Sequence, residues 1–318
     1  MNSTYFRSNS LFLNKIKIMK FSKESDLDKV LNSLIIPYKE RVPDVYKVID
    51  GMLKEGMIFK EEAIKNDHIA FRTLGVPNLG IASLEKIFLH YGYEKRDYYF
   101  FPEKKLNAFW YSHPEPRYPR IFISELRVSD LSQNAKTIIK KYTGKIKKDP
   151  VDKLDFENVD EVSTFFTSAL WELPTLADYQ SLQEESEYAA WVIYNRYYLN
   201  HFTISIHDLP DGYNSLKEFN TFLKSIGIKL NNAGGEIKVS KDGFLKQSSS
   251  VAGKVTANFQ GSEVIEIPGS YVEFAERLVL PQFQSLPKSE IDRKHRRDGF
   301  EAANADKIFE STYESQQE

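Results

Sequence analysis

Residues 67–73, DHIAFRT, and residues 200–206, NHFTISI, carry the pattern that decides the fold. Each stretch begins with a polar residue and a histidine and continues with apolar residues at alternating positions. Such alternation is typical of a β-strand, because successive side chains of a strand point to opposite faces of its sheet. The two stretches therefore predict two strands that open two similar structural units.

The segments after these strands repeat one order of elements, a helix followed by three strands. For the first copy we expect a strand at 67–73, a helix at 83–91 and strands at 98–101, 108–112 and 120–126. For the second copy we expect a strand at 199–206, a helix at 215–226 and strands at 236–239, 251–259 and 270–276. A duplicated βαβββ module predicts an α+β fold with an open, cupped mixed sheet.

The rest of the chain is expected to surround these two modules. Apolar residues at helical spacing predict two helices within 25–65, and a mostly helical insertion is expected between the modules. We expect one domain over 25–318, with modules at 66–130 and 198–280, the insertion at 131–197 and a C-terminal helix at 298–312. Residues 1–24, rich in Ser, Asn and Lys, are expected to be a disordered lead-in, within which Met19 is a second candidate translation start.

Composition excludes several classes of function. The 43 Lys and Arg residues nearly balance 45 Asp and Glu residues, so the chain has no basic field suited to nucleic acid. It contains no cysteine, so any metal would be bound by nitrogen and oxygen atoms. No apolar run reaches the roughly 18 residues of a membrane-spanning helix, and the N-terminus lacks a signal-peptide core. We therefore expect a cytoplasmic protein without membrane partners; the sequence leaves its oligomeric state open.

Strand parity places the candidate functional residues on common faces. His68 and Arg72 share one face of their strand, and His201 lies on the polar face of the matching strand. In the last expected strand, SYVEFAER at 270–277, Tyr271 and Glu273 share a face, while Glu276 lies on the other. Glu273 is flanked by bulky residues, an unusual setting for a solvated carboxylate.

Two imidazoles and one carboxylate can form a facial metal site with open coordination positions. His68, His201 and Glu273 are the candidates, and an arginine such as Arg72 can pair with a substrate carboxylate. Spacing alone also permits simpler roles. Buried histidines commonly serve packing, and Arg72 or Glu273 could belong to an ordinary ion pair.

Four strings in the chain resemble one known family. They are DHIAFRTLG at 67–75, YPRIFISEL at 118–126, LNHFTI at 199–204 and IPGSYVEFAERL at 267–278. Together they are similar to the 2-oxoadipate dioxygenase/decarboxylase family, also called hydroxyglutarate synthase, over residues 31–311. The resemblance implies the vicinal oxygen chelate fold, whose paired βαβββ modules match the repeat. It also implies Fe(II) bound by His68, His201 and Glu273, and Arg72 as a substrate-binding residue.

The implied reaction consumes O₂ and a small 2-oxo acid. With 2-oxoadipate, decarboxylation and hydroxylation would give 2-hydroxyglutarate and CO₂, and the family name suggests a place in lysine catabolism. The chain's middle region is shorter than in some members, so the acid's identity is less well supported than the reaction class. The C-terminal part also resembles 4-hydroxyphenylpyruvate dioxygenase, in which a Gly-Phe helix follows the glutamate strand. In residues 298–311 this implies that Phe300 is part of a lid, or that the helix simply caps the sheet.

Two alternatives remain open on the sequence. One is a glyoxalase-like isomerase or lyase that binds Zn²⁺ or Ni²⁺ through four ligands, Glu125 being the fourth. The other is a small-acid binding protein that has lost its metal, which the presence of both histidines and Glu273 disfavours. For Glu125 we expect an inward-facing structural role, or a hydrogen bond to a ligand or the substrate, rather than a bond to the metal. Tyr271 is expected to hydrogen-bond a ligand or the substrate. The other histidines are weaker candidates for the site. His207 precedes a loop, and we expect His90, His113 and His295 to be solvated.

Overall fold

The computed structural model describes residues 25–317, so the expectation for residues 1–24 lies outside the described residues. Its centre is an eight-stranded mixed sheet with the strand order β2-β3-β4-β1-β5-β10-β7-β6. The first module contains β1 (Asn66–Leu74), α3 (Ile81–His90), β2 (Glu94–Phe101), β3 (Leu106–Ser112) and β4 (Arg120–Leu126). The second contains β5 (His201–Ser205), α8 (Leu216–Ser225), β6 (Lys238–Val239), β7 (Leu245–Ser249) and β10 (Tyr271–Arg277). The predicted α+β fold with two βαβββ modules is confirmed.

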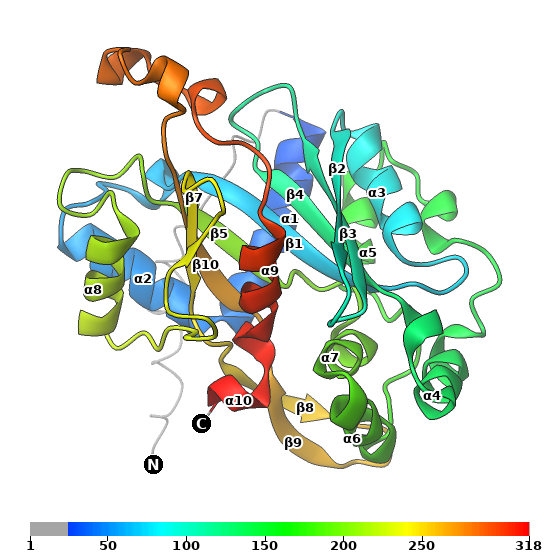
Figure 1. Cartoon of the computed structure of the whole chain (residues 1–318). Helices are drawn as coiled ribbons and strands as arrows, with labels where there is room; N and C mark the ends of the chain where they lie inside the picture. The colour runs from blue at the N-terminus through cyan, green and yellow to red at the C-terminus, as the bar shows by residue number, and fades with distance from the viewer. Residues whose placement is uncertain (1–24, 318) are drawn as a thin grey trace, which may run out of the picture.

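The two modules meet at their first strands. β1 and β5 pair antiparallel, and each pairs in parallel with the last strand of its own module, β4 or β10. The sheet therefore has approximate twofold symmetry about the β1–β5 pair. The helices α3 and α8 lie at opposite ends of the view in Figure 1, each beside its own module.

One predicted strand of the second module is wrong. The sheet contains β7 at Leu245–Ser249, whereas much of the predicted strand at 251–259 forms β8 (Lys254–Asn258), which pairs with β9 (Val264–Pro268) in a separate two-stranded sheet. The reason is that β7 ends in Gln247, Ser248 and Ser249, all buried, so it lacks the apolar alternation of an ordinary strand. Residues 251–259 have that alternation but lie outside the main sheet.

Helices cover the sheet and fill the insertion. Near the N-terminus are α1 (Asp26–Arg41) and α2 (Pro43–Lys54), and Ser25 and Asp28 form a capping box at the start of α1. The insertion contains α4 (Gln133–Thr143), α5 (Val159–Phe165), α6 (Leu176–Glu185) and α7 (Glu187–Asn195). Each of these four begins after a Ser, Asn or Thr whose side chain accepts a backbone hydrogen bond of its first turn.

The C-terminal part closes the concave face of the sheet. The helix predicted at 298–312 begins only at α9 (Ala302–Phe309), because Gly299 has a left-handed φ of 66° and Phe300 precedes the helix. A 3₁₀ turn at Glu310–Thr312 and α10 (Glu314–Gln317) follow. The helix α9 contacts both β2 and β6, the two end strands of the sheet, and crosses the front of the sheet in Figure 1. The sheet is therefore curled around a space that α9 covers.

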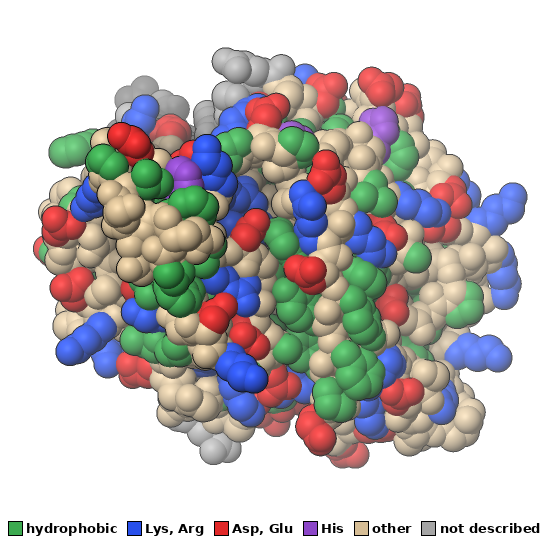
Figure 2. Space-filling model, turned by 45° about the horizontal axis from the view of Figure 1, so that its top comes forward, with side chains coloured by type: hydrophobic (Ala, Val, Ile, Leu, Met, Phe, Trp, Pro, Cys, Tyr) green, Lys and Arg blue, Asp and Glu red, His purple; other side chains and the backbone are tan. Residues whose placement is uncertain are grey.

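The molecular surface agrees with the balanced composition. Acidic and basic side chains are interspersed over the face shown in Figure 2. Among residues 25–317, no helix combines the length and the apolar character that crossing a membrane requires.

Candidate metal centre

Three adjacent strands bring His68, His201 and Glu273 together on the concave face. Their side chains come from β1, β5 and β10 and are almost completely buried. His68 Nε2 lies 3.3 Å from His201 Nε2 and 3.5 Å from Glu273 Oε1, and His201 Nε2 lies 3.2 Å from Glu273 Oε2. Within residues 25–317, these three residues form the cluster of His and acidic side chains that is arranged closely enough to hold a metal ion.

The distances within this triad fit a metal ion bound on one face. Ligand atoms about 2.1 Å from a metal and at right angles to each other are about 3 Å apart. The three measured separations are close to that value. Without a cation, two imidazole nitrogens and a carboxylate would face one another in a buried space, which is electrostatically unfavourable. The donor set of two nitrogens and one oxygen therefore fits a divalent transition metal.

Each histidine is oriented by the residue that precedes it. Asp67 Oδ1 lies 2.8 Å from His68 Nδ1, and Asn200 Oδ1 lies 3.1 Å from His201 Nδ1. These bonds occupy Nδ1 and leave Nε2 for a metal. Thr203 Oγ1, 3.0 Å from His68 Nε2, is the additional polar neighbour of that nitrogen.

The sequence analysis did not assign Asp67 or Asn200 to the site, although the repeated polar residue before each histidine was the available signal. Strict alternation would place both residues on the opposite face from the histidines. The β1–β5 pairing shifts register between Asn66 and His68, which interrupts that alternation beside Asp67.

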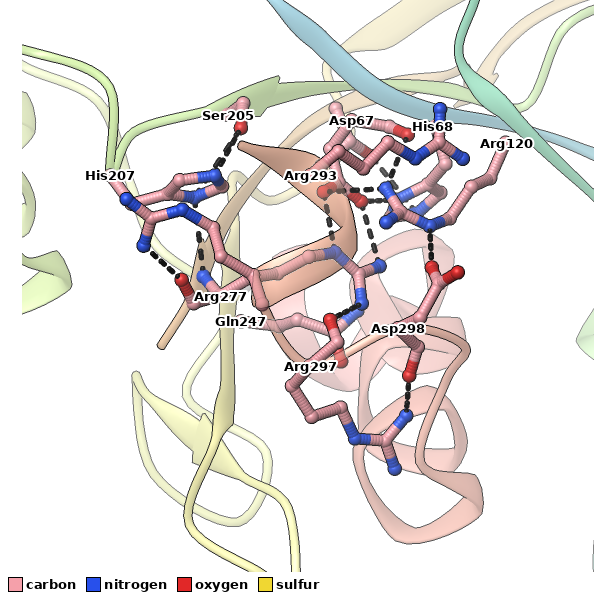
Figure 3. A network of polar contacts seen from close by, with 12 residues as sticks. Asp67, His68, Arg120, Ser205, His207, Gln247, Arg277, Arg293, Arg297 and Asp298 are labelled. Atoms are coloured by element: carbon pink, nitrogen blue, oxygen red, sulfur yellow. Dashed lines mark hydrogen bonds and ion pairs between the residues drawn. The ribbon is translucent and has the colours of Figure 1, made fainter. Parts of the chain in front are cut away.

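Asp67 is held by a network of arginines (Figure 3). Arg277 binds it through two nitrogens, at 2.6 and 2.9 Å, and Arg120 Nη1 lies 3.3 Å from its Oδ2. Burial alone would raise the pKa of Asp67, but Arg277 and Arg120 hold it well below its ordinary value. Asp67 is therefore an ionised carboxylate that faces His68.

The two histidines have opposite electrostatic surroundings. Burial alone would lower the pKa of His68, but the negative charges of Glu273 and Asp67 outweigh it and raise the pKa. Burial lowers the pKa of His201 well below its ordinary value, and the nearby charges of His68 and Arg72 add to this effect. His201 is therefore neutral, as a metal ligand must be.

Glu273 is also oriented by a hydrogen bond that the sequence analysis missed. Gln247 donates from Nε2 to Glu273 Oε1 at 2.7 Å. Asn304 donates from Nδ2 to the amide oxygen of Gln247, Oε1, at 3.0 Å. Because Asn304 lies on α9, the covering helix is connected to a candidate metal ligand through one side chain.

Arg72 and Tyr271 place polar groups beside the triad. Arg72 is buried, and it donates from Nη1 to Thr312 Oγ1 at 2.8 Å and from Nη2 to the Phe309 carbonyl at 2.9 Å. The ring of Tyr271 lies 4.8 Å from that of His201. Within residues 25–317, neither Arg72 Nε nor the Tyr271 hydroxyl has a partner at good hydrogen-bond geometry, although both atoms are buried and Arg72 lies close enough to Tyr271 to oppose the rise that burial causes in the tyrosine's pKa. Unpartnered buried polar atoms are costly, so a polar ligand would stabilise this arrangement.

Phe300 covers the triad from the side of the C-terminal segment. Its ring centroid lies 4.8 Å from the rings of both His68 and Phe122, and the side chain is buried. Its backbone N–H donates to the Tyr99 hydroxyl at 3.0 Å. This position is compatible with the predicted lid, which stays a prediction.

Glu125 has a structural role, one of the two expected for it, but the expected inward direction and the hydrogen bond to a ligand or the substrate are wrong. In the sheet, Glu125 pairs with Thr73, so its side chain lies on the face opposite His68. The Glu125 carboxylate accepts a hydrogen bond from the N–H of Ile81, the first residue of α3, at 2.9 Å. Glu276 does the same in the second module, where it accepts from the N–H of Leu216 at 2.9 Å at the start of α8. By this symmetry Glu276, not Glu273, is the counterpart of Glu125. A four-ligand site that includes Glu125 is therefore excluded by its position.

The other histidines lie outside the triad. His207 accepts from the N–H of Arg277 at 3.2 Å and lines a cleft of about 630 Å³. Asp67, Arg120 and Arg277 also line this cleft, but the three triad residues do not. His90 is exposed, as expected, whereas His113 and His295 are partly buried and pack against aromatic rings.

Comparisons with known proteins give a consistent result. A family model described as 2-oxoadipate dioxygenase/decarboxylase matches residues 30–287. The chain is 42% identical over 308 residues to the chloroplastic 2-oxoadipate dioxygenase/decarboxylase of Arabidopsis thaliana, covering 93% of this chain and 80% of that protein. It is 47% identical over 263 residues to the chloroplastic/amyloplastic protein of that name from Oryza sativa subsp. japonica, covering 79% and 70%.

Solved structures confirm the fold. The crystal structure of the hydroxyglutarate synthase from Oryza sativa in complex with 2-oxoadipate matches with a TM-score of 0.83 and 42% identity, over 94% of this chain and 96% of that one. A glyoxalase-superfamily protein from Ralstonia eutropha matches with a TM-score of 0.66 and 20% identity, over 87% of each chain. The expected vicinal oxygen chelate architecture is thus confirmed.

Proposed function

The chain belongs to the 2-oxoadipate dioxygenase/decarboxylase family, and on that premise we propose that it decarboxylates and oxidises 2-oxoadipate at a metal held by His68, His201 and Glu273. Membership makes it an oxidoreductase. The observation that supports this site best is the convergence of three buried ligand atoms from adjacent strands beside two unpartnered polar atoms. We further propose that residues 25–318 form a single catalytic domain.

We propose Fe(II) as the metal, because two histidines and one carboxylate with open positions are the ligand set of non-haem Fe(II) oxygenases. When bound, iron would supply the redox chemistry with O₂. The reaction balances with 2-oxoadipate and O₂ as reactants and 2-hydroxyglutarate and CO₂ as products. One oxygen atom of O₂ enters the new carboxylate, and the other enters the hydroxyl group.

The protein's own residues bind the acid and protect the reaction. Arg72 pairs with a substrate carboxylate, with its free Nε–H and the Tyr271 hydroxyl as additional donors. Asp67 and Asn200 keep both Nε2 atoms directed at the metal. Phe300 and α9 keep water away from the reacting acid.

Anaerobic loading with Fe(II), followed by exposure to O₂ and a panel of 2-oxo acids, tests this function. We expect O₂ uptake with 2-oxoadipate and a product with the mass of 2-hydroxyglutarate. Glu273→Gln should lose metal and activity, whereas Glu276→Gln, three residues along on the opposite face, should keep both. If the iron-loaded protein consumes no O₂ with any of the acids, the oxygenase function is wrong; conversion without O₂ would favour the isomerase or lyase alternative.

The names of the two plant relatives place those proteins in the chloroplast or amyloplast. A cytoplasmic location and a role in lysine catabolism therefore remain predictions for this chain.

A further inference from the structure

The cleft of about 630 Å³ lies at the end of the sheet where β1 and β4 begin and β5 and β10 end. Asp67 lines it, but the three triad residues do not. Its apolar wall includes Phe202, which lies on the face of β5 opposite His201. The volume is typical of small-molecule sites, so the cleft can hold a ligand outside the space above the triad.

Basic side chains outnumber acidic ones around this cleft. Its lining contains six Lys and Arg residues, namely Lys65, Arg117, Arg120, Arg277, Arg293 and Arg296, and four acidic residues, namely Glu62, Asp67, Asp208 and Asp292. Neither Arg293 nor Arg296 forms an ion pair with a carboxylate of residues 25–317. Arg293 donates to the Tyr118 carbonyl at 2.7 Å, and Arg296 donates to the Arg277 carbonyl at 2.8 Å. The excess of positive charge makes the cleft attractive to anions.

Three of these arginines crowd around one buried carboxylate. Figure 3 shows Arg120, Arg277 and Arg293 close to Asp67. Burial lowers the pKa of Arg120 to about 10, and the charges of Arg277 and Arg293 add to this effect. Asp67 and the exposed Asp298 oppose it, but two carboxylates do not balance three guanidinium groups. A further anion in the cleft would relieve the repulsion that remains.

Two side chains of the cleft have buried polar atoms without partners. Arg120 is 3% exposed, and it uses Nη1 to bind Asp67 and Nε to bind Asp298. Its Nη2 has no hydrogen-bond partner among the described residues, and neither has the nitrogen or the oxygen of the Asn66 amide. Buried donors without partners are costly, so both side chains would be stabilised by a ligand that accepts hydrogen bonds.

The available donors come from three separate segments of the chain. Asn66 begins β1, Arg120 begins β4, and Arg293 begins a 3₁₀ turn at Arg293–His295. A planar carboxylate presents its two oxygens in one plane, whereas the oxygens of a tetrahedral phosphate point in several directions. Guanidinium groups also bind phosphate especially well, because their N–H groups match the spacing of its oxygens. The donor arrangement therefore favours phosphate over a simple carboxylate.

From this arrangement we infer that the cleft is a second ligand site, which binds inorganic phosphate or the phosphate group of a small ester through Asn66, Arg120 and Arg293. The inference does not depend on the proposed function, because no triad residue takes part. The apolar wall of the cleft, which includes Ile64 and Phe202, would contact the remainder of an ester.

Calorimetric titration of the metal-loaded protein with inorganic phosphate, at constant ionic strength, tests this site. In Arg293→Met and in Asn66→Leu we expect Kd to rise about 10-fold or more, the usual effect of losing a hydrogen bond to a charged group. Arg297→Met is the matched control, because Arg297 lies in the same segment, pairs with Asp242 and does not line the cleft. Its Kd should equal that of the unchanged protein.

Two further measurements separate phosphate binding from folding and from the metal. Asn66→Leu should not lower the midpoint of thermal unfolding, because the amide that it removes has no partner to lose. Glu273→Gln, which removes a proposed metal ligand, should bind phosphate as before, so phosphate bound at the metal itself would be recognised.

Titrations with phenyl phosphate and with acetate identify the ligand. Tighter binding of phenyl phosphate than of inorganic phosphate would assign the site to phosphate esters, and equal or weaker binding would assign it to inorganic phosphate. Acetate should bind at least 10-fold more weakly than phosphate. The inference is overturned if phosphate does not bind saturably, if acetate binds equally well, or if Arg293→Met and Asn66→Leu behave like Arg297→Met.

Discussion

Asp67 Oδ1 lies 2.8 Å from His68 Nδ1, while the same carboxylate is bound by two nitrogens of Arg277. A candidate metal ligand is therefore fixed by an ion pair that spans from the first module to the last strand of the second. Because a carboxylate behind a histidine sets its tautomer and increases its basicity, this pair should influence how tightly metal binds.

Asp67→Asn should weaken metal binding about 10- to 100-fold, because the amide keeps the shape but loses the negative charge. It also leaves Arg277 and Arg120 without their buried counter-ion, so the free energy of unfolding should fall by about 3 kcal/mol or more. Metal titration and thermal unfolding measure the two effects separately. Asp298→Asn is the control, since Asp298 binds Arg120 but is half-exposed and does not contact a histidine. Unchanged metal affinity in Asp67→Asn would contradict the role assigned to Asp67.

Glu125→Gln should leave metal binding unchanged and reduce the free energy of unfolding by about 0.5–2 kcal/mol, the usual range for a helix cap. The reason is that Glu125 accepts from the first N–H of α3 on the opposite face of the sheet. Glu276→Gln should behave alike, because it occupies the symmetric position at α8. Loss of metal in Glu125→Gln would instead restore the four-ligand site.

Phe300→Leu should reduce the amount of hydroxy acid formed for each O₂ consumed. The smaller side chain would open the contact with His68 and admit water to the reacting acid. Oxygen uptake and product mass, measured on the same sample, give this ratio. Phe165→Leu, a substitution in the buried core away from the triad, is the control and should leave the ratio unchanged. An unchanged ratio in Phe300→Leu would mean that the C-terminal segment only caps the sheet.

The second module shows where sequence patterns stop being informative. The strand β7 could not be predicted, since Gln247 and the serines after it are buried on the site side and lack apolar alternation. No sequence feature distinguishes Lys238 from a surface lysine, but in the structure it is buried on β6, which α9 contacts. Glu125 and Glu273 looked equivalent in sequence because each lies near the end of a strand, but strand register separates them onto opposite faces.

The sequence by itself determined the duplicated strands, the shared face of His68 and Arg72, and the choice of Glu273 over Glu276. These follow from the period of two along a single strand, which is a local property of the backbone. Only the tertiary structure decided that Asp67 and Asn200 orient the histidines and that Gln247 orients Glu273. It also decided that Arg72 forms no ion pair with a carboxylate of residues 25–317 and instead donates to Thr312 and Phe309. Those relationships depend on register, on a local irregularity and on the curvature of the sheet, which arise from packing between segments far apart in the chain.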